Sequence, residues 1–171
     1  MSDAVARTLW VLIVVAAIAA TLWAMRRGWV HRQQRQAGIA EPMPLPADAG
    51  ASITGPCSGR YVGSVLAGDW LDRIAVHDLG VRSNADLTVA EAGILVERQG
   101  ARDIFIPRAD IRGVRADRGI AGRVQERGGV LVVTWELGGR LVESGFRADV
   151  GGEQAALISS IELVLTEERT S

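Results

Sequence analysis

The sequence predicts a mainly β domain that ends in one α-helix and follows a single N-terminal transmembrane helix. Three observations lead to this fold class: a charge-free apolar run over residues 8–25, a series of short alternating segments between residues 59 and 146, and an amphipathic stripe over residues 153–168. The first two give the anchor and the strands, and the third gives the closing helix.

The apolar run at residues 8–25 has the length of a membrane span. A helix rises about 1.5 Å per residue, so the run measures about 27 Å, close to the hydrocarbon thickness of a bilayer. Trp10 lies near one end and Trp23 near the other, where amphipathic rings favour the interface. Arg26 and Arg27 follow at once, and the N-terminal flank has no positive region, so an uncleaved anchor is favoured over a cleaved signal peptide.

The charges beside the run predict its orientation. Four arginines lie within ten residues on its C-terminal side and one arginine lies on its N-terminal side. The positive-inside rule therefore predicts a single-pass protein of the cell membrane, with its N-terminus outside and its C-terminal domain in the cytoplasm. The single cysteine, Cys57, agrees with a cytoplasmic domain and is interpreted as an ordinary thiol.

The charge of the remaining chain argues against one class of partner. All basic residues are arginine, and residues 37–171 hold fourteen arginines against nineteen acidic residues. A net acidic body does not attract nucleic acid through its overall field, so we expect no nucleic-acid partner.

Composition also predicts three parts of the chain. Residues 1–36 form the anchor with its basic flank, and residues 37–56 contain four of the five prolines, which is typical of an extended linker. Residues 57–171 are long enough for one compact domain with a core.

Seven short strands are expected in that domain. The clearest is at residues 130–137, where Leu131, Val133, Trp135 and Leu137 alternate with other residues, followed by a two-residue Gly138–Gly139 turn. The predicted strands are 59–66, 85–89, 93–98, 103–107, 111–116, 130–137 and 140–146.

Two segments have helical spacing. Residues 69–80 begin with an aspartate and end in a glycine, which predicts a short helix or a tight insertion between the first two strands. Residues 153–168 place five apolar side chains on one stripe, which predicts a C-terminal helix. Those side chains are Leu157, Ile158, Ile161, Val164 and Leu165.

Seven strands and one C-terminal helix are the element order of a pleckstrin-homology-like (PH-like) barrel. Three stretches make the resemblance more specific: GRYVGSVLAGDWLDRIAVHDLGVRS, ERQGARDIFIPRADIRGVRADRGIAG and GGVLVVTWELGGRLVESGF. The chain resembles small single-pass membrane proteins of high-GC Gram-positive bacteria (actinobacteria) that carry a bacterial PH-like domain and are often encoded near pyrimidine-biosynthesis genes. The resemblance implies a seven-stranded PH-like barrel and brings no catalytic residues with it.

The residues give no sign of enzyme chemistry. His31 and His77 have no second histidine or cysteine at metal-ligand spacing, and His77 is interpreted as a surface histidine on a short acidic helix. The sequence has no nucleophile motif and no Walker A or dinucleotide-binding pattern. We therefore expect a protein that is not an enzyme and that needs no cofactor or metal.

Arginine is the one chemical concentration, and two interpretations stay open. Guanidinium groups suit phosphate oxygens, so the cluster predicts a contact for an anion or a phosphorylated partner. Interleaved acids also permit a solvated, internally paired face. The candidate contact residues are Arg112, Arg115, Arg118, Arg123 and Arg127, with Arg108 at the edge of the cluster. Phosphoinositide binding does not carry over from eukaryotic PH domains, because the first hairpin is acidic at Asp69 and Asp72.

Aromatic residues are interpreted mainly as core. Trp135 and Phe146 lie in alternating apolar strands and are expected to be buried. Trp70 is the better candidate for an exposed aromatic anchor, although core packing is favoured for it as well.

Two main hypotheses for function follow. The first is a non-enzymatic, membrane-anchored module that recruits a protein partner or further copies of itself. The second is a domain that binds anionic lipid through the arginine loop, and a third is an accessory subunit of a membrane transport or export system. No small-molecule cofactor is expected in any of them.

Overall fold

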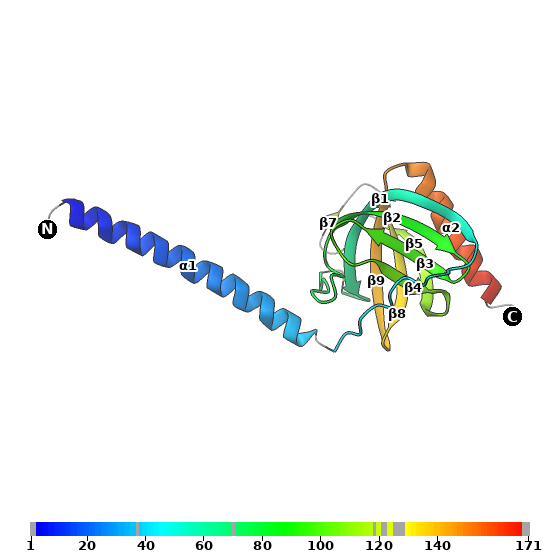
Figure 1. The fold of residues 1–171 in the computed structure, drawn as a ribbon, viewed down its shortest axis with the longest axis horizontal. Coiled ribbons are helices and arrows are strands. Elements are labelled where there is room, and N and C mark those ends of the chain that lie inside the picture. The colour runs from blue at the N-terminus through cyan, green and yellow to red at the C-terminus, as the bar shows by residue number, and fades with distance from the viewer. Residues whose placement is uncertain are drawn as a thin grey trace. The chain divides into compact units, whose positions relative to one another are not determined.

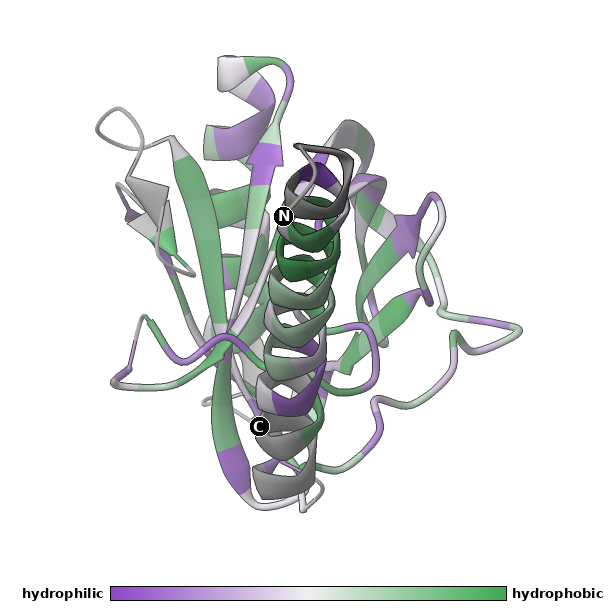
Figure 2. Cartoon of the chain, turned by 90° about the vertical axis from the view of Figure 1, so that its left-hand side faces the viewer, coloured by the Kyte–Doolittle hydropathy of each residue, from purple (hydrophilic) through white to green (hydrophobic). Residues whose placement is uncertain are grey.

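The protein consists of two compact units, residues 1–37 and residues 38–171. The structure is a computed structural model that describes residues 3–36, 38–69, 71–117, 119–120, 123–124 and 129–168. The first unit is the helix α1, Asp3–Arg35. Its segment Arg7–Gly28 is long and apolar enough to cross a membrane, in agreement with the predicted run (Figure 2). Within it, the Thr21 hydroxyl donates to the carbonyl of Ala17 at 2.8 Å, so this polar group is satisfied inside the helix.

The second unit is built on one antiparallel seven-stranded sheet, as the sequence predicts (Figure 1). Its strand order is β4-β3-β2-β1-β9-β8-β5, so two meanders meet where β1 pairs with β9. Strand β1 pairs with β2 along its first part and with β9 along its second part, which lets one strand belong to both halves of the barrel. The strands of this sheet are β1 Ser52–Leu66, β2 Ser83–Ala90, β3 Gly93–Arg98, β4 Ile104–Pro107, β5 Ile111–Asp117, β8 Val130–Leu137 and β9 Arg140–Ala148.

Short elements complete the second unit. A 3-10 turn, η1 (Arg108–Asp110), joins β4 to β5. A small hairpin, β6 Gly119–Ile120 and β7 Arg123–Val124, lies between β5 and β8. Ile120 of this hairpin is buried with Val62, Val65, Val130 and Val132 in a second, smaller apolar cluster. The sequence analysis did not predict this hairpin.

The segment interpreted as a linker, residues 37–56, contributes to the domain. Ile39 is 2% exposed and belongs to the main core, and β1 already begins at Ser52. The backbone of residues 49–51 is bonded to the β2–β3 turn, because Ala49 and Ala51 accept hydrogen bonds from the amides of Ala92 and Glu91. The compact unit therefore starts at Gly38, whereas the sequence analysis placed the domain boundary at residue 57.

The predicted short helix at residues 69–80 is wrong; the described part of this segment forms turns and a bridge. Besides the bonds of its own turns, its backbone bonds to β1: the amide of Ile74 donates to the carbonyl of Ser64 at 3.0 Å, and the amide of Ser64 donates to the carbonyl of Leu79 at 2.8 Å. Both Ile74 and Leu79 are fully buried. The segment is thus the tight insertion that the sequence analysis offered as the alternative, and Trp70 lies outside the described residues.

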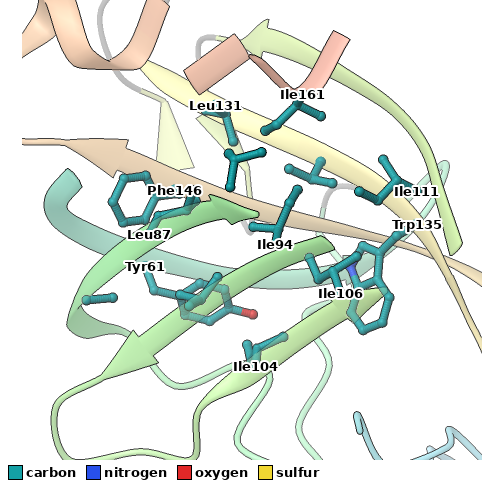
Figure 3. Packing of buried hydrophobic residues seen from close by; sticks show 14 of the residues in the cluster. Tyr61, Leu87, Ile94, Ile104, Ile106, Ile111, Leu131, Trp135, Phe146 and Ile161 are labelled. Atoms are coloured by element: carbon teal, nitrogen blue, oxygen red, sulfur yellow. The ribbon is translucent and has the colours of Figure 1, made fainter. Parts of the chain in front are cut away.

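The C-terminal helix α2, Gly151–Glu168, packs on the sheet through its apolar stripe. Leu157, Ile161 and Val164 are buried, and Ile158 and Leu165 pack against the core at its edge. The main core gathers side chains from β1–β5, β8, β9 and α2 (Figure 3). Trp135 and Phe146 lie in it, as predicted, at 1% and 2% exposure.

A chain of polar groups runs through this core. The Tyr61 hydroxyl donates to the carbonyl of Leu79 at 2.9 Å and contacts the Ser64 hydroxyl at 2.6 Å. Ser64 contacts Ser144 at 2.6 Å, and the Trp135 indole donates to Ser144 at 2.9 Å. The network joins β1, β8, β9 and the loop after β1. Each of its four side chains has a partner, so none of its hydroxyls is left unpaired.

Arg98 extends the buried polar region at the edge of the barrel. Its guanidinium lies over the Tyr61 ring, 4.8 Å from the centroid, and donates to the carbonyls of Asp78, Val81 and Arg102. Burial lowers the pKa of this guanidinium. These bonds hold the loop before β2 and the loop after β3 against the end of β3.

Candidate protein-interaction groove

The first arginines of the predicted cluster lie on η1 and β5. Arg112 and Arg115 lie on β5, and the backbone of Arg123 lies in β7. Arg118 and Arg127 lie outside the described residues. The structure therefore describes the side chains of two of the five predicted contact residues.

Arg115 is held by carboxylates of the domain itself. Its guanidinium donates to both oxygens of Glu143 at 2.9 and 3.0 Å and to Asp117 at 3.1 Å. The bond to Glu143 is the main reason why the pKa of Arg115 is raised. A bidentate pair of this kind fixes the side chain across β5, β8 and β9.

Arg112 and Arg108 also have partners within the domain. Arg112 donates to Glu136 at 2.8 Å and to the carbonyl of Ala109 at 2.5 Å. Arg108 donates to the carbonyl of Val164 at 2.9 Å and so ties η1 to α2. The described arginines are thus paired with groups of the domain itself. The sequence analysis left this arrangement open as one of two interpretations, the other being an anion contact. A contact role for Arg112, Arg115, Arg118, Arg123 and Arg127 stays a prediction.

Arg112 does, however, border a groove between β5 and α2. The groove has a volume of about 390 Å³ and is lined by Arg112, Gly113 and Val114 of β5 and by Glu162, Leu165 and Thr166 of α2. β5 is the last strand of the sheet, so its second edge has no neighbouring strand in that sheet. The groove thus runs along the free edge of a β-strand.

The lining combines apolar and charged groups. Val114 and Leu165 are half-buried and pack against the core, which makes the floor of the groove partly apolar. The Glu162 carboxylate is exposed and has no ion-pair or hydrogen-bond partner among the described residues. Such a groove can hold an extended segment through backbone hydrogen bonds, with a pocket for an apolar side chain and a carboxylate for a basic one.

Contacts at the middle of α2 and toward its C-terminal end hold the wall of the groove in place. The hydroxyl of Thr54 on β1 contacts that of Ser160, and the Arg108 bond to Val164 holds the last turns of the helix. Leu157 and Ile161 anchor the same helix in the core. The groove is therefore preformed, and an incoming segment does not have to order α2.

The sequence analysis missed Gly113, Val114, Glu162 and Thr166 as groove residues. Leu165 was predicted only as part of the apolar stripe, and it lies at the exposed border of that stripe. The relatively polar pattern of β5 was the available signal. Which strand ends the sheet, and which helix face lies beside it, depends on pairing between distant segments.

Neither histidine is among the described residues that line the groove. His31 is in α1, and His77 is in the insertion between β1 and β2, where its Nε2 lies 2.9 Å from the carbonyl oxygen of Ile39. His77 thus contacts the start of the domain and is not on a helix. No group of three or more His, Cys, Asp or Glu side chains close enough to hold a metal occurs among the described residues.

Comparisons with known proteins agree with the fold. Residues 39–162 match the family model described as "Bacterial PH domain-like". The match begins at Ile39, which is also the first buried residue of the second compact unit. No curated protein matches the chain.

Proposed function

We propose that this chain, which belongs to the bacterial PH domain-like family, is a membrane-anchored protein-interaction module without enzyme activity. PH-like domains are generally non-catalytic. The observation that carries the proposal is the groove at the free edge of β5, beside α2. The partner is a protein with an extended segment that adds to β5 as a further strand.

The groove chemistry supports a segment of particular composition. An extended peptide presents alternate side chains to the same face. If one apolar residue of the peptide faces Val114 and Leu165, the residue two positions later therefore faces the groove as well. The Glu162 carboxylate, which has no partner among the described residues, favours a basic side chain there. We therefore expect a segment in which an apolar residue and a basic residue are two positions apart.

We further propose that α1 anchors the domain at the cell membrane with the domain on the cytoplasmic side. The length and apolar surface of Arg7–Gly28 support a single span, and the excess of arginines after it supports the orientation. Fusing a reporter that is active only outside the cytoplasm to each terminus tests this. An active C-terminal fusion and an inactive N-terminal one would overturn the orientation.

Anchoring also affects how strong the contact has to be. A domain confined to a membrane meets co-localised partners at a high effective concentration, near the millimolar range for short linkers. A groove of this size therefore suffices for recruitment even if the isolated contact is weak.

A bulky side chain placed in the groove tests the proposal. A Cβ added at Gly113 meets no atom within 4 Å, and Gly113 lines the groove, so Gly113→Trp is the variant chosen to place a bulky side chain there. Gly152→Trp is the matched control, because that glycine also has open space and lies at the other end of α2. Thr166 replaced by a photo-crosslinking amino acid captures the partner from native membranes.

The expected result is one crosslinked partner that is lost in Gly113→Trp and kept in Gly152→Trp. An identical crosslinking pattern in both variants would contradict the groove as the contact site. A captured segment without an extended conformation would contradict strand addition.

Anionic-lipid binding is the alternative proposal, and two facts weaken it. Arg112 and Arg115 are already paired with carboxylates, and residues 37–171 carry five more acidic than basic residues. Salt-sensitive binding of the full chain to added anionic vesicles, in excess of neutral ones, would support it. Service to a transport or export system would appear as a transporter among the crosslinked partners.

A further inference from the structure

The outer face of β9, β1, β2 and β3 carries two neighbouring rows of polar residues. In the first row, Arg147, Arg60 and Asn84 lie side by side on three strands. In the second row, Ser58 lies beside Asp86 and Asp86 lies beside Glu97. Asp149 continues this row, because its amide donates to the carbonyl of Ser58. We call these the basic row and the acidic row.

The rows lie on the solvent side of the sheet, about 7 Å apart. Ser58, Arg60, Asn84, Glu97, Arg147 and Asp149 are all exposed, whereas the residues that alternate with them point into the barrel and are buried. The rows are two residues apart on each strand, which corresponds to about 7 Å along the strand direction. Neighbouring strands place members of one row about 4.8 Å apart.

Each row sets like charges directly opposite each other. Arg60 faces Arg147 across the β1–β9 pair, and Asp86 faces Glu97 across the β2–β3 pair. Directly opposed like charges destabilise a sheet. Within the described part of the chain, Arg60, Arg147, Glu97 and Asp149 make no ion pair or side-chain hydrogen bond that would offset this cost.

A hollow beside the basic row adds to its cationic character. The hollow has a volume of about 320 Å³ and is lined by Arg60, Arg82, Ser83 and Asn84. In the acidic row, by contrast, the Ser58 hydroxyl donates to Asp86 at 2.6 Å and holds that carboxylate in place. One face of the sheet therefore presents a basic band and an acidic band in parallel.

We infer that this face binds the same face of a second copy of the chain. A two-fold axis that lies in the plane of contact, parallel to the rows and midway between them, sets the basic row of each copy over the acidic row of the other. Arg147 then faces Asp149 of the second copy, Asn84 faces Asp86, and Arg60 faces Ser58 with acidic residues on both sides. A two-fold contact uses one patch twice, so it requires this kind of self-complementary surface.

Other occupants match the face less well. A flat anionic membrane would approach the acidic row together with the basic row, and like charges across an interface oppose binding. A uniformly acidic or basic protein would satisfy one row and repel the other. A second copy brings both rows at the same spacing, and its own anchor brings it into the same membrane.

Charge reversal with rescue is the test, applied to the full chain in neutral nanodiscs or native membranes. One variant reverses the basic row (Arg60→Glu with Arg147→Glu), and a second reverses the acidic row (Asp86→Arg with Asp149→Arg). A third variant carries all four changes. The control is Arg140→Glu, an exposed arginine in β9 outside both rows. Circular dichroism establishes that each variant is folded.

We expect self-association of the first two variants to be weaker by about tenfold or more, because like charges would now face each other. The variant with all four changes should regain self-association, as should a mixture of the first two. High salt should weaken association of the wild-type chain. Failure of both the four-change variant and the mixture to associate, or unchanged association in either row variant, would overturn the inference. The groove variant Gly113→Trp should associate normally, so the two proposals fail separately.

Discussion

Removing the Tyr61 hydroxyl gives a defined test of the buried polar network. Tyr61→Phe keeps the ring in the core and under the Arg98 guanidinium, and removes only the hydroxyl. Two hydrogen bonds are lost, one to the Leu79 carbonyl and one to Ser64. Each is worth about 1 kcal/mol net, so the free energy of unfolding should fall by about 2 kcal/mol.

The size of the loss depends on what the former partners do. The Leu79 carbonyl still accepts the amide of Ser64 at 2.8 Å, and the Ser64 hydroxyl still contacts Ser144. Neither partner is left unpaired, so the larger cost of burying an unsatisfied polar group does not arise. We therefore expect about 2 kcal/mol and not about 4 kcal/mol.

Denaturant unfolding of the detergent-solubilised full chain, followed by near-ultraviolet circular dichroism, measures this difference. Thr166→Val is the control, because the Thr166 hydroxyl is exposed and bonds within its own helix. Its free energy of unfolding should change by less than about 0.5 kcal/mol. A Tyr61→Phe protein within about 0.5 kcal/mol of wild type would refute the reasoning, since the hydroxyl would then contribute nothing.

The same residue predicts an alkaline pH dependence. Burial raises the pKa of Tyr61, the only tyrosine, so the folded state favours the neutral hydroxyl. Tyrosine ionises at about pH 10 in the unfolded chain, so the stabilisation is complete below that pH and is lost as the pH rises above it. The difference between wild type and Tyr61→Phe should therefore shrink above about pH 10. Tyrosinate absorbance that appears well before unfolding would contradict this.

Three further predictions concern packing and the thiol. Ile161→Ala, at a fully buried position of α2, should cost about 2–5 kcal/mol in unfolding free energy, whereas Leu163→Ala on the exposed side of the same helix should cost less than about 0.5 kcal/mol; equal losses would contradict the assigned faces. Gly145→Val should cost about 1–3 kcal/mol, because its Cβ would lie 2.3 Å from the Ile120 side chain, and adding Ile120→Ala should recover part of the loss in the same denaturation assay. Burial, and then the charge of Glu153, raise the pKa of Cys57, the only cysteine. A thiol reagent at neutral pH should therefore label the chain only as fast as it unfolds. Rapid labelling of the folded protein would contradict this prediction.

Sequence patterns located most strands because alternation is a local property. The bounds predicted for residues 93–98 and 130–137 are those of β3 and β8. Gly138 and Gly139 both have positive φ, 57° and 79°, which the two-residue turn between β8 and β9 requires and which glycine adopts without strain. The stripe of α2 was also readable, because helical spacing depends only on neighbours in the chain.

The misjudged segments are those whose backbone partners lie elsewhere. Residues 69–80 have helix-like ends and spacing, yet hydrogen bonds to β1 replace the helical ones. The first part of β1 includes Gly55 and Pro56, which are poor strand formers. They lie at a register shift, and the pairing of Thr54 and Cys57 with β2 on either side of them keeps this segment in the sheet. Ile39 stands before a proline-rich stretch and is buried in the core, so the folded domain begins ahead of that stretch.

The sequence by itself determined a single apolar span, an acidic C-terminal body, seven strands and a closing amphipathic helix, because each depends on composition or on a short repeating pattern. Only the tertiary structure decided that β5 ends the sheet beside α2, that Arg112 and Arg115 are held by Glu136 and Glu143, and that Arg60 lies opposite Arg147. The physical reason is that strand register and charge pairing join residues far apart in the chain, and a shift of one residue would turn every side chain of a strand to the other face.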